Sequence, residues 1–319
     1  MRAAHALGGA LAAVLAGCAP GHAMPDAKLG DRAACAGYSG LPAGWRTAER
    51  AGMVKVAGGT FQLGGERGYA EERPPRETRV ASFWIDRTEV TNAQFAGFVE
   101  ATGYATEAER GGGAAVFKMP GELPAMDPRF WWHLDAKADW RHPDGLSSSI
   151  RGRANEPVVD VTYNDALAYA KWLGRTLPTE AQWEYAAKAG QGNEESDAAL
   201  RDAQGRPNAN FWQGMFPLKN TAEDGFTGRA PVGCFAANPG GLHDMVGNVW
   251  EWTRDPYTGG HDTLGDPMPE GGAAPRKVIK GGSYLCSLDY CARARAASRQ
   301  GQESDLPASH IGFRTITAE

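Results

Sequence analysis

Short stretches that alternate apolar and polar residues begin near residue 53. Residues 53–56 and 60–63 have this pattern and flank the glycine pair Gly58 and Gly59. Residues 78–85 carry the same pattern and predict a further strand. We therefore expect the chain after residue 53 to begin with a sheet of short strands.

Helical spacing of apolar residues follows these strands. After Thr91, aromatic residues starting at Phe95 recur on one helical face, and Gly103 is expected to close this first helix. Residues 164–173 have apolar residues at the same spacing and predict a second helix, with Gly174 as its C-cap.

A third helix is predicted to begin after Thr179. Thr179 can cap its start while Gln182 reaches back to complete a capping box, and Gly190 is expected to end it. Beyond this helix, aromatic and glycine-rich segments such as residues 247–252 are typical of turns and short strands. The order of these elements predicts an α+β fold with two or three helices and much irregular, loop-rich chain.

The N-terminus has the features of an export signal. Arg2 gives a positive start, and residues 6–16 form an apolar run broken only by two glycines. This run is well short of the roughly 20 residues that a membrane-spanning helix needs. Residues 15–18 resemble a bacterial lipobox, which predicts a signal peptide over residues 1–17 and a lipid on Cys18; cleavage without lipidation is the alternative. We expect an exported protein, anchored at the periplasmic face of a bacterial membrane or secreted.

The rest of the chain, after the predicted signal peptide, divides by composition into two parts. Residues 18–50 are rich in Ala, Gly and Pro, and predict a flexible linker that contains Cys35. Residues 51–319 are long enough for one large domain. Of all 319 residues, 42% are apolar, which is ample for a core, and the net charge is −5. Because the basic residues are scattered, the sequence has no electrostatic footprint for nucleic acid.

Cys286 and Cys291 are the sharpest chemical feature of the sequence. In an exported protein, two nearby cysteines often form a structural disulfide. A two-thiolate metal site is a second interpretation. It favours copper(I), because structural zinc normally takes four ligands and no second Cys pair or His cluster lies nearby. A redox-active pair is the third interpretation.

Several motifs share a family resemblance. Leu-Pro-Thr-Glu at residues 177–180 and Gly-Asn-Val-Trp-Glu-Trp at 247–252 mark a wide superfamily, whereas Trp-Arg-His-Pro at 140–143 and the Cys pair are narrower. Together they resemble the formylglycine-generating enzyme family, also called sulfatase-modifying factors, over about residues 53–315. The resemblance implies a single domain with a C-type-lectin-like core. The other matching segments are residues 130–132, 177–186, 210–226, 281–291 and 312–314.

The resemblance also implies a chemistry. The family converts a cysteine of a client protein to formylglycine with molecular oxygen as co-substrate, and here Cys286 and Cys291 would hold the copper(I). The clients would be unfolded or nascent sulfatase chains with a Cys-x-Pro-x-Arg type sequence, and the enzyme would act as a monomer. The matching catalytic residues are Cys286, Cys291, Ser283 and Tyr290, and the matching substrate-binding residues are Trp250 and Arg314.

Two structural calcium sites are implied as well. In a loop-rich domain, a bound cation would satisfy carbonyl groups that no helix or sheet pairs. The alternative is that Asp224 and Asp244 simply make turns, and Asp244 stands where the family has Asn. The first set consists of Asn210, the Phe211 carbonyl, Asp224 and the Phe226 carbonyl, and the second of Asp244, the Gly247 and Val249 carbonyls, and Glu251.

Some positions depart from the family pattern. Ser287 and Asp289 stand where the family usually has a His and a Ser, and Asp289 is expected to raise the pKa of the thiols through repulsion between like charges. His310 stands where the family has Asn. Cys35 and Cys234 have no assigned counterpart, and either pair with each other or remain free.

Two other classes of protein stay open at this point. One is a non-catalytic binding or assembly lipoprotein on the same fold, with Cys286 and Cys291 locked as a disulfide. The other is an oxygen-dependent enzyme for a small thiol, which would use iron in a His-rich site. The seven His residues are dispersed along the chain, so the second class ranks last.

Overall fold

The computed structural model describes residues 1, 28–66, 68–120, 127, 130–189, 200–258 and 274–319. Residues 2–17 of the predicted signal peptide, Cys18 and the first part of the predicted linker lie outside these residues. Among the helices that are described, none has the length and apolar character needed to cross a membrane.

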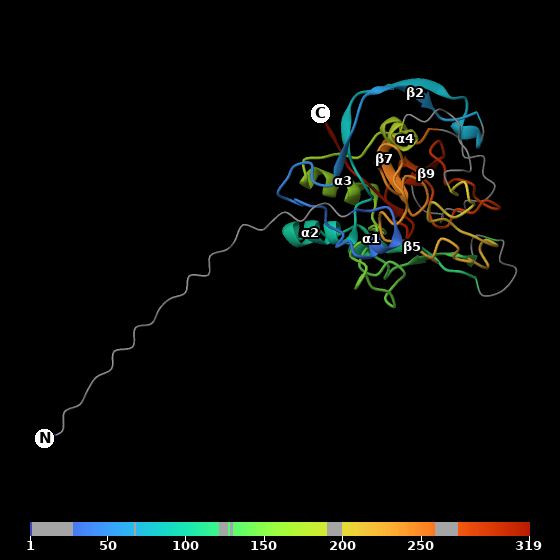
Figure 1. The fold of residues 1–319 in the computed structure, drawn as a ribbon. Helices are drawn as coiled ribbons and strands as arrows, with labels where there is room; N and C mark the ends of the chain where they lie inside the picture. Colours follow the sequence, from blue (N-terminus) through green and yellow to red (C-terminus); the bar gives the residue numbers. More distant parts are fainter. Residues whose placement is uncertain (2–27, 67, 121–126, 128–129, 190–199, 259–273) are drawn as a thin grey trace.

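A four-stranded sheet lies at the centre of the molecule (Figure 1). Its strand order is β10-β7-β8-β9, and β10 runs parallel to β7 while the other neighbours are antiparallel. The connection from β8 to β9 carries Cys286 and Cys291. The strands are β7 (Trp250–Pro256), β8 (Arg276–Lys280), β9 (Arg299–Glu303) and β10 (Ile311–Gly312).

A second sheet joins the two ends of the domain. It has the order β1-β4-β11, formed by β1 (Met53–Val56), β4 (Phe83–Asp86) and β11 (Ile316–Ala318). The single strand predicted over residues 78–85 is therefore wrong. The chain breaks at Ala81 and Ser82, so that β3 (Arg76–Val80) pairs with β2 (Gly59–Leu63) while β4 pairs with β1 and β11.

The first two predicted helices are present. In α2 (Asn92–Thr102), Thr91 and Gln94 form a capping box, and Gly103 adopts the left-handed conformation, with φ of 66°. α3 (Tyr163–Trp172) begins at a capping box made by Thr162, and its C-cap is Leu173 rather than the expected Gly174.

The third helix, α4 (Glu180–Lys188), begins at the predicted capping box of Thr179 and Gln182. It ends at Ala189, with φ of 43°, and the predicted terminator Gly190 lies outside the described residues. The remaining elements are α1 (Arg32–Ala36), the single turns η1 (Ala70–Glu72) and η2 (Ala108–Gly112), and the hairpin of β5 (Ala114–Phe117) and β6 (Trp132–Asp135).

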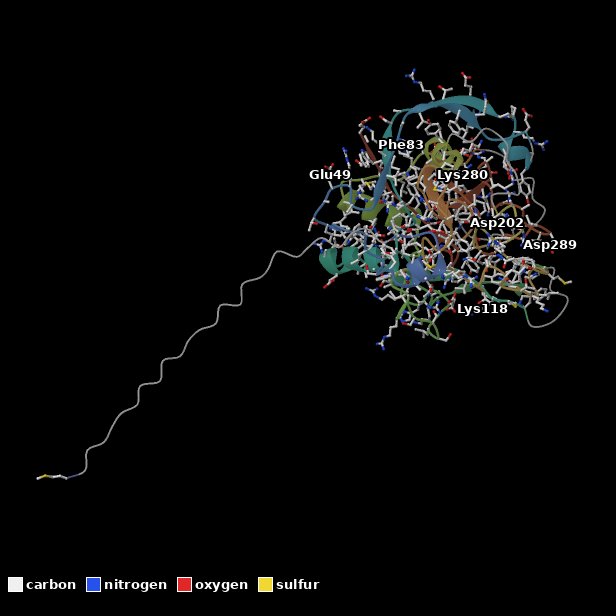
Figure 2. All side chains as sticks on the ribbon, in the orientation of Figure 1. Glu49, Phe83, Lys118, Asp202, Lys280 and Asp289 are labelled. Carbon is white, nitrogen blue, oxygen red and sulfur yellow. A yellow bond between two sulfur atoms is a disulfide. The ribbon has the colours of Figure 1, made fainter. Side chains whose placement is uncertain are left out.

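The helices cover the central sheet with aromatic side chains. Phe95 of α2 and Tyr169 of α3 pack with Phe313 and with Trp252 of β7 in one buried cluster. On α4, Glu184 accepts a buried hydrogen bond from Lys280 of β8 at 2.8 Å, so an ion pair ties this helix to the sheet. Figure 2 shows Lys280 inside the molecule and Asp289 at its edge.

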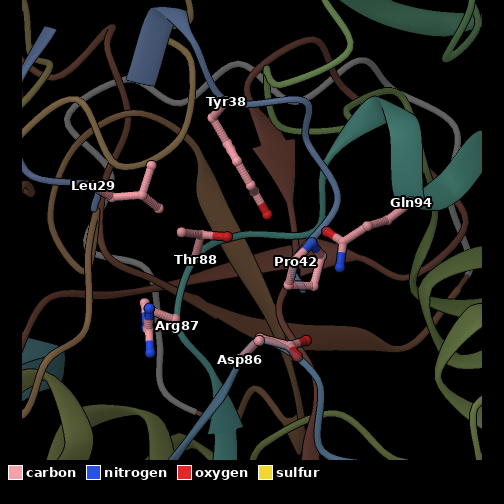
Figure 3. Close-up of a pocket in the computed structure, with 8 residues that line it drawn as sticks. Leu29, Tyr38, Pro42, Asp86, Arg87, Thr88 and Gln94 are labelled. Carbon is pink, nitrogen blue, oxygen red and sulfur yellow. The ribbon is translucent and has the colours of Figure 1, made fainter. Parts of the chain in front are cut away.

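The segment before β1 differs from the predicted linker. Cys35 of α1 is buried and forms a disulfide with Cys234, 199 residues away in the sequence. The N–H of Gly30 donates to the Gly233 carbonyl at 2.8 Å. A small pocket lies where this arm meets the chain from the end of β4 to α2 (Figure 3); it is lined by Leu29, Tyr38 and Pro42 of the arm and by Asp86, Arg87, Thr88 and Gln94. From residue 28, the arm is therefore part of the folded domain.

Candidate functional site

The loop that carries the two cysteines begins at a pair of glycines. Gly281 and Gly282 have φ of 97° and 74°, in the left-handed region that favours glycine. A Cβ on Gly282 would lie 2.7 Å from the Cα of Ala294. The motif Gly-Gly-Ser-Tyr thus lets the chain leave β8 in a tight turn and pass close under the segment that returns toward β9.

The structure brings Cys286 and Cys291 together as free thiols. Their Sγ atoms are 3.8 Å apart, compared with about 2.05 Å in a disulfide. The side chain of Cys286 is 4% exposed and that of Cys291 is half-buried. The structure therefore does not contain the disulfide that was one interpretation of this pair. Two reduced sulfurs at this separation are a donor set that suits copper(I), because soft thiolates select it.

Hydrogen bonds favour the thiolate form of Cys286. The Cys291 thiol, and to a smaller extent the Ser283 N–H and the nearby Arg293 guanidinium, lower the pKa of Cys286 although burial opposes them. The pKa of Cys286 falls overall, so the increase expected from Asp289 does not decide its direction. Asp289 is exposed, and its carboxylate accepts a hydrogen bond from the Ser287 hydroxyl.

The other predicted catalytic residues flank the pair. Ser283 is fully buried and its Oγ accepts a hydrogen bond from the Leu285 N–H at 3.2 Å. Tyr290 is 37% exposed, and its ring stacks on Phe216 with centroids 4.8 Å apart. Trp250 is buried in the same apolar cluster as Cys286. Its predicted contact with substrate stays a prediction.

The prediction that Arg314 binds substrate is wrong. The guanidinium is fully buried and donates to both carboxylate oxygens of Glu251 at 2.7 Å, and also to the carbonyls of Asp86 and His243. Trp183 Nε1 donates to the same carboxylate at 2.8 Å. Because these groups engage the guanidinium and seal it from solvent, Arg314 holds β7, β4 and the C-terminal segment together.

The residues of the first predicted calcium set gather in one place. The Asp224 carboxylate is buried and accepts hydrogen bonds from the N–H groups of Phe211 at 3.1 Å and Phe226 at 2.9 Å. Burial raises the pKa of Asp224 despite these bonds. The amide nitrogen of Asn210 donates to the carbonyl of Gly228 and to Asn248 Oδ1, both at 2.9 Å.

Gln213, which sequence reasoning missed, occupies the centre of this set. Its Nε2 donates to Asp224 Oδ2 at 2.7 Å and to the Phe211 carbonyl, while its Oε1 accepts from the Asp224 N–H at 3.2 Å. Since that backbone N–H can only donate, the amide nitrogen must face the two candidate ligand oxygens. A cation held by Asp224 and the Phe211 carbonyl would compete with the Gln213 amide nitrogen for these oxygens.

This loop also touches the cysteine loop. The N–H of Trp212, between Phe211 and Gln213, donates to the carbonyl of Cys286 at 2.9 Å. The position of Cys286 is thus connected to the first calcium set by one residue.

The second predicted calcium set lies where β7 begins. Asp244 has φ of 56° and accepts a hydrogen bond from the Gly233 N–H at 2.6 Å. Gly247 and Val249 are buried between Asp244 and Glu251. Among the described residues, no three His, Cys, Asp or Glu side chains are grouped closely enough to hold a metal, so backbone carbonyls would have to complete this set.

Glu89, also missed from the sequence, faces this set. It is fully buried, and within the described part of the chain its Oε2 has no hydrogen-bond partner. Burial, then the charges of Asp244 and Glu251, raises its pKa well above the usual value. A buried carboxylate oxygen without a donor fits a cation. No sequence motif marks Glu89, because only the fold brings it to β7.

Two features set the class of this protein: its loop-rich α+β fold and the two reduced cysteines in the β8–β9 connection. Residues 40–319 match the family described as the sulfatase-modifying factor enzyme 1-like domain. The PvdO structure from Pseudomonas aeruginosa has a TM-score of 0.53 and 26% identity, and the match covers 84% of this chain and 94% of that one.

Relatives with higher sequence identity narrow the class of protein to one enzyme family. The formylglycine-generating enzyme of Thermomonospora curvata is 46% identical over 288 residues, which cover 82% of this chain and 92% of that protein. The Mus musculus enzyme of the same name is 42% identical over 322 residues, 95% of this chain and 87% of that one. The chain belongs to the formylglycine-generating enzyme family. An inactive C-alpha-formylglycine-generating enzyme 2 of Mus musculus is 39% identical over 280 residues, covering 83% of this chain and 85% of that one, so similar chains include both active and inactive proteins.

Proposed function

We propose that this protein converts a cysteine of sulfatase-type client chains to formylglycine, with copper(I) held by Cys286 and Cys291 and oxygen as co-substrate. The observation that carries the proposal is the reduced thiol pair, with sulfurs 3.8 Å apart and Cys291 half-buried. A permanent disulfide at this place would leave no soft donor for a metal and no thiolate beside a visiting sulfur.

The chain's own residues supply position and charge. The pairing of the two thiols and the Ser283 N–H lower the pKa of Cys286 and so favour its ionised form. Copper(I), when bound, would supply a site for a third thiolate and for the activation of oxygen. Tyr290 and its aromatic neighbours at the rim would exclude water from one side of the client cysteine.

The overall reaction is balanced by an external thiol reductant. The side chain of the client cysteine loses two electrons as its β-carbon becomes an aldehyde, and its sulfur leaves as hydrogen sulfide. Two reductant thiols lose two further electrons and form a disulfide. Molecular oxygen accepts these four electrons. The products contain two oxygen atoms, one in the aldehyde and one in water.

The proposed location is outside the cytoplasm, with an anchor at Cys18 or in secreted form. The Cys35–Cys234 disulfide supports export, because such bonds persist in oxidising compartments. Structural calcium at the two candidate sets is also part of the proposal. Glu89 Oε2 supports the second set, and at the first set the cation would replace the Gln213 amide nitrogen.

The test is a reaction of the copper(I)-loaded protein with oxygen, a thiol reductant and a Cys-x-Pro-x-Arg peptide. Mass spectrometry is expected to show the loss of mass that accompanies conversion of the cysteine side chain to an aldehyde. Cys286→Ser and Cys291→Ser should abolish it, and a peptide with Ala in place of Cys should not change in mass. Copper-loaded protein that leaves the peptide unchanged would instead support a non-catalytic binding role.

A further inference from the structure

The turn η1, in the connection from β2 to β3, packs on the chain that follows Cys291. The Arg293 guanidinium donates to Glu71 at 2.7 Å and to the Arg299 carbonyl at 2.9 Å. The side chains of this ion pair are 7% and 2% exposed. Glu71 and Arg293 are 222 residues apart in the sequence, so only the fold brings them together.

Tyr69 completes this contact. The Arg293 guanidinium lies 3.7 Å from the centre of the Tyr69 ring, within the range of a cation–π interaction. The phenol and the guanidinium are both within electrostatic reach of the Cys286 and Cys291 sulfurs.

We propose that Tyr69 and Glu71 fix Arg293 beside the thiol pair and so act as positioning residues for it. This inference rests on the proposed function. Even with copper(I) bound, two cysteine thiolates and a client thiolate would leave the site with a net negative charge, and a guanidinium held in place would offset it. An arginine side chain has many rotamers, and the ring and the carboxylate restrict Arg293 to one of them.

The backbone supports the same role. The N–H of Arg293 donates to the Cys291 carbonyl at 2.8 Å. A displacement of Arg293 would therefore move the backbone of Cys291. Tyr69 and Glu71 are the groups that η1 and its N-terminal flank contribute to prevent this.

The same turn offers a matched control. Arg295 donates to both oxygens of Glu72 at 2.6 and 2.8 Å, and to the Ala292 carbonyl at 2.9 Å. Glu72→Gln weakens a buried ion pair of the same type between η1 and the same segment, and it leaves Arg293 with its partners. A merely structural role of η1 predicts equal effects of Glu71→Gln and Glu72→Gln.

The experiment measures copper(I) affinity of the full chain by competition with a chromophoric copper(I) chelator, at a temperature where every variant is folded. Glu71→Gln and Tyr69→Leu are each expected to weaken copper(I) binding by about 10-fold or more, as is typical when groups that orient metal ligands are lost. Glu72→Gln should lower the unfolding temperature and change copper(I) affinity by less than about 2-fold.

The outcomes separate this inference from the proposed function. If the parent binds copper(I) but Glu71→Gln and Tyr69→Leu bind it equally well, or if Glu72→Gln weakens it as much, the positioning role is refuted. A parent that binds no copper(I) overturns the proposed function and this inference together. With peptide as substrate, Glu71→Gln should lower kcat more than it changes KM.

Discussion

Replacement of both Cys35 and Cys234 by alanine is expected to destabilise the protein strongly. The disulfide joins residues 199 apart, so it closes most of the described domain into one loop. In the chain-entropy treatment, a crosslink over such a loop stabilises the fold by about 5 kcal/mol, and native disulfides are typically worth about 2–5 kcal/mol. We expect the double variant to lose about 3–5 kcal/mol of unfolding free energy.

The remaining contacts of the arm cannot offset this loss. Near the disulfide, hydrogen bonds stay possible from the Gly30 N–H to the Gly233 carbonyl at 2.8 Å, from Asn155 Nδ2 to the Cys35 carbonyl at 2.7 Å, and from the Arg32 guanidinium to the Asp224 carbonyl. Each contributes about 1 kcal/mol net. Ordering of the arm's backbone opposes them with about 1–2 kcal/mol per residue. The arm should therefore open locally as well, and protease should cut it faster than in the parent.

The assay is urea unfolding followed by tryptophan fluorescence, with the free energy taken from the midpoint and the slope. Parent protein treated with a reductant should unfold like the variant, because Cys286 and Cys291 are already thiols. A double variant within about 1 kcal/mol of the parent would refute the entropy argument. Equal protease resistance of the arm would show that its packing alone holds it.

Three further predictions concern buried polar groups. Asp160 is buried, and within the described residues neither carboxylate oxygen has a hydrogen-bond partner; burial, against the pull of Arg229, raises its pKa well above the usual value. The folded state then keeps a proton that the unfolded chain releases, so the free energy of unfolding falls as the pH rises from about 4 through the folded pKa. Asp160→Asn should therefore unfold at a higher temperature than the parent at pH 8 but not at pH 4. Arg314→Met leaves the Glu251 charge buried without its guanidinium partner, and urea unfolding should show a loss of about 3–5 kcal/mol, whereas a loss below about 1 kcal/mol would contradict the assigned structural role. Gln213→Ala removes the amide nitrogen that occupies the first calcium set, so calcium relative to a chelator should raise the unfolding temperature more in this variant than in the parent; a smaller rise would mean that Gln213 supports the cation instead of standing in its place.

Local signals account for the parts of the fold that the sequence predicts well. Capping residues such as Thr91 and Thr179 act within three residues of themselves, so their helices begin where expected. The strand pattern of residues 78–85 is misleading because periodicity does not reveal which partner each half pairs with. Val80 ends a hairpin with β2, whereas Phe83 begins the pairing with β1 and β11.

From residue 28 on, the segment predicted to be a flexible linker is folded, for a similar reason. Its composition is that of a flexible segment, but one covalent bond to Cys234 and the burial of Cys35 hold this described part on the domain. Connectivity between cysteines cannot be read from a single sequence. The pairing of Cys35 with Cys234 is therefore only one of two alternatives until the fold is known.

At the thiol site, the sequence motif predicts the two cysteine sulfurs but not the residues that hold the cysteines in place. Trp212 fixes the Cys286 carbonyl from one side, and Arg293 with the η1 turn fixes the chain after Cys291 from the other. Cys286 is nearly sealed, while Cys291 is half-buried beside the exposed ring of Tyr290. In the proposed reaction a client sulfur would therefore approach past Cys291 and Tyr290, and the buried Cys286 would hold the metal from the side that is sealed from solvent.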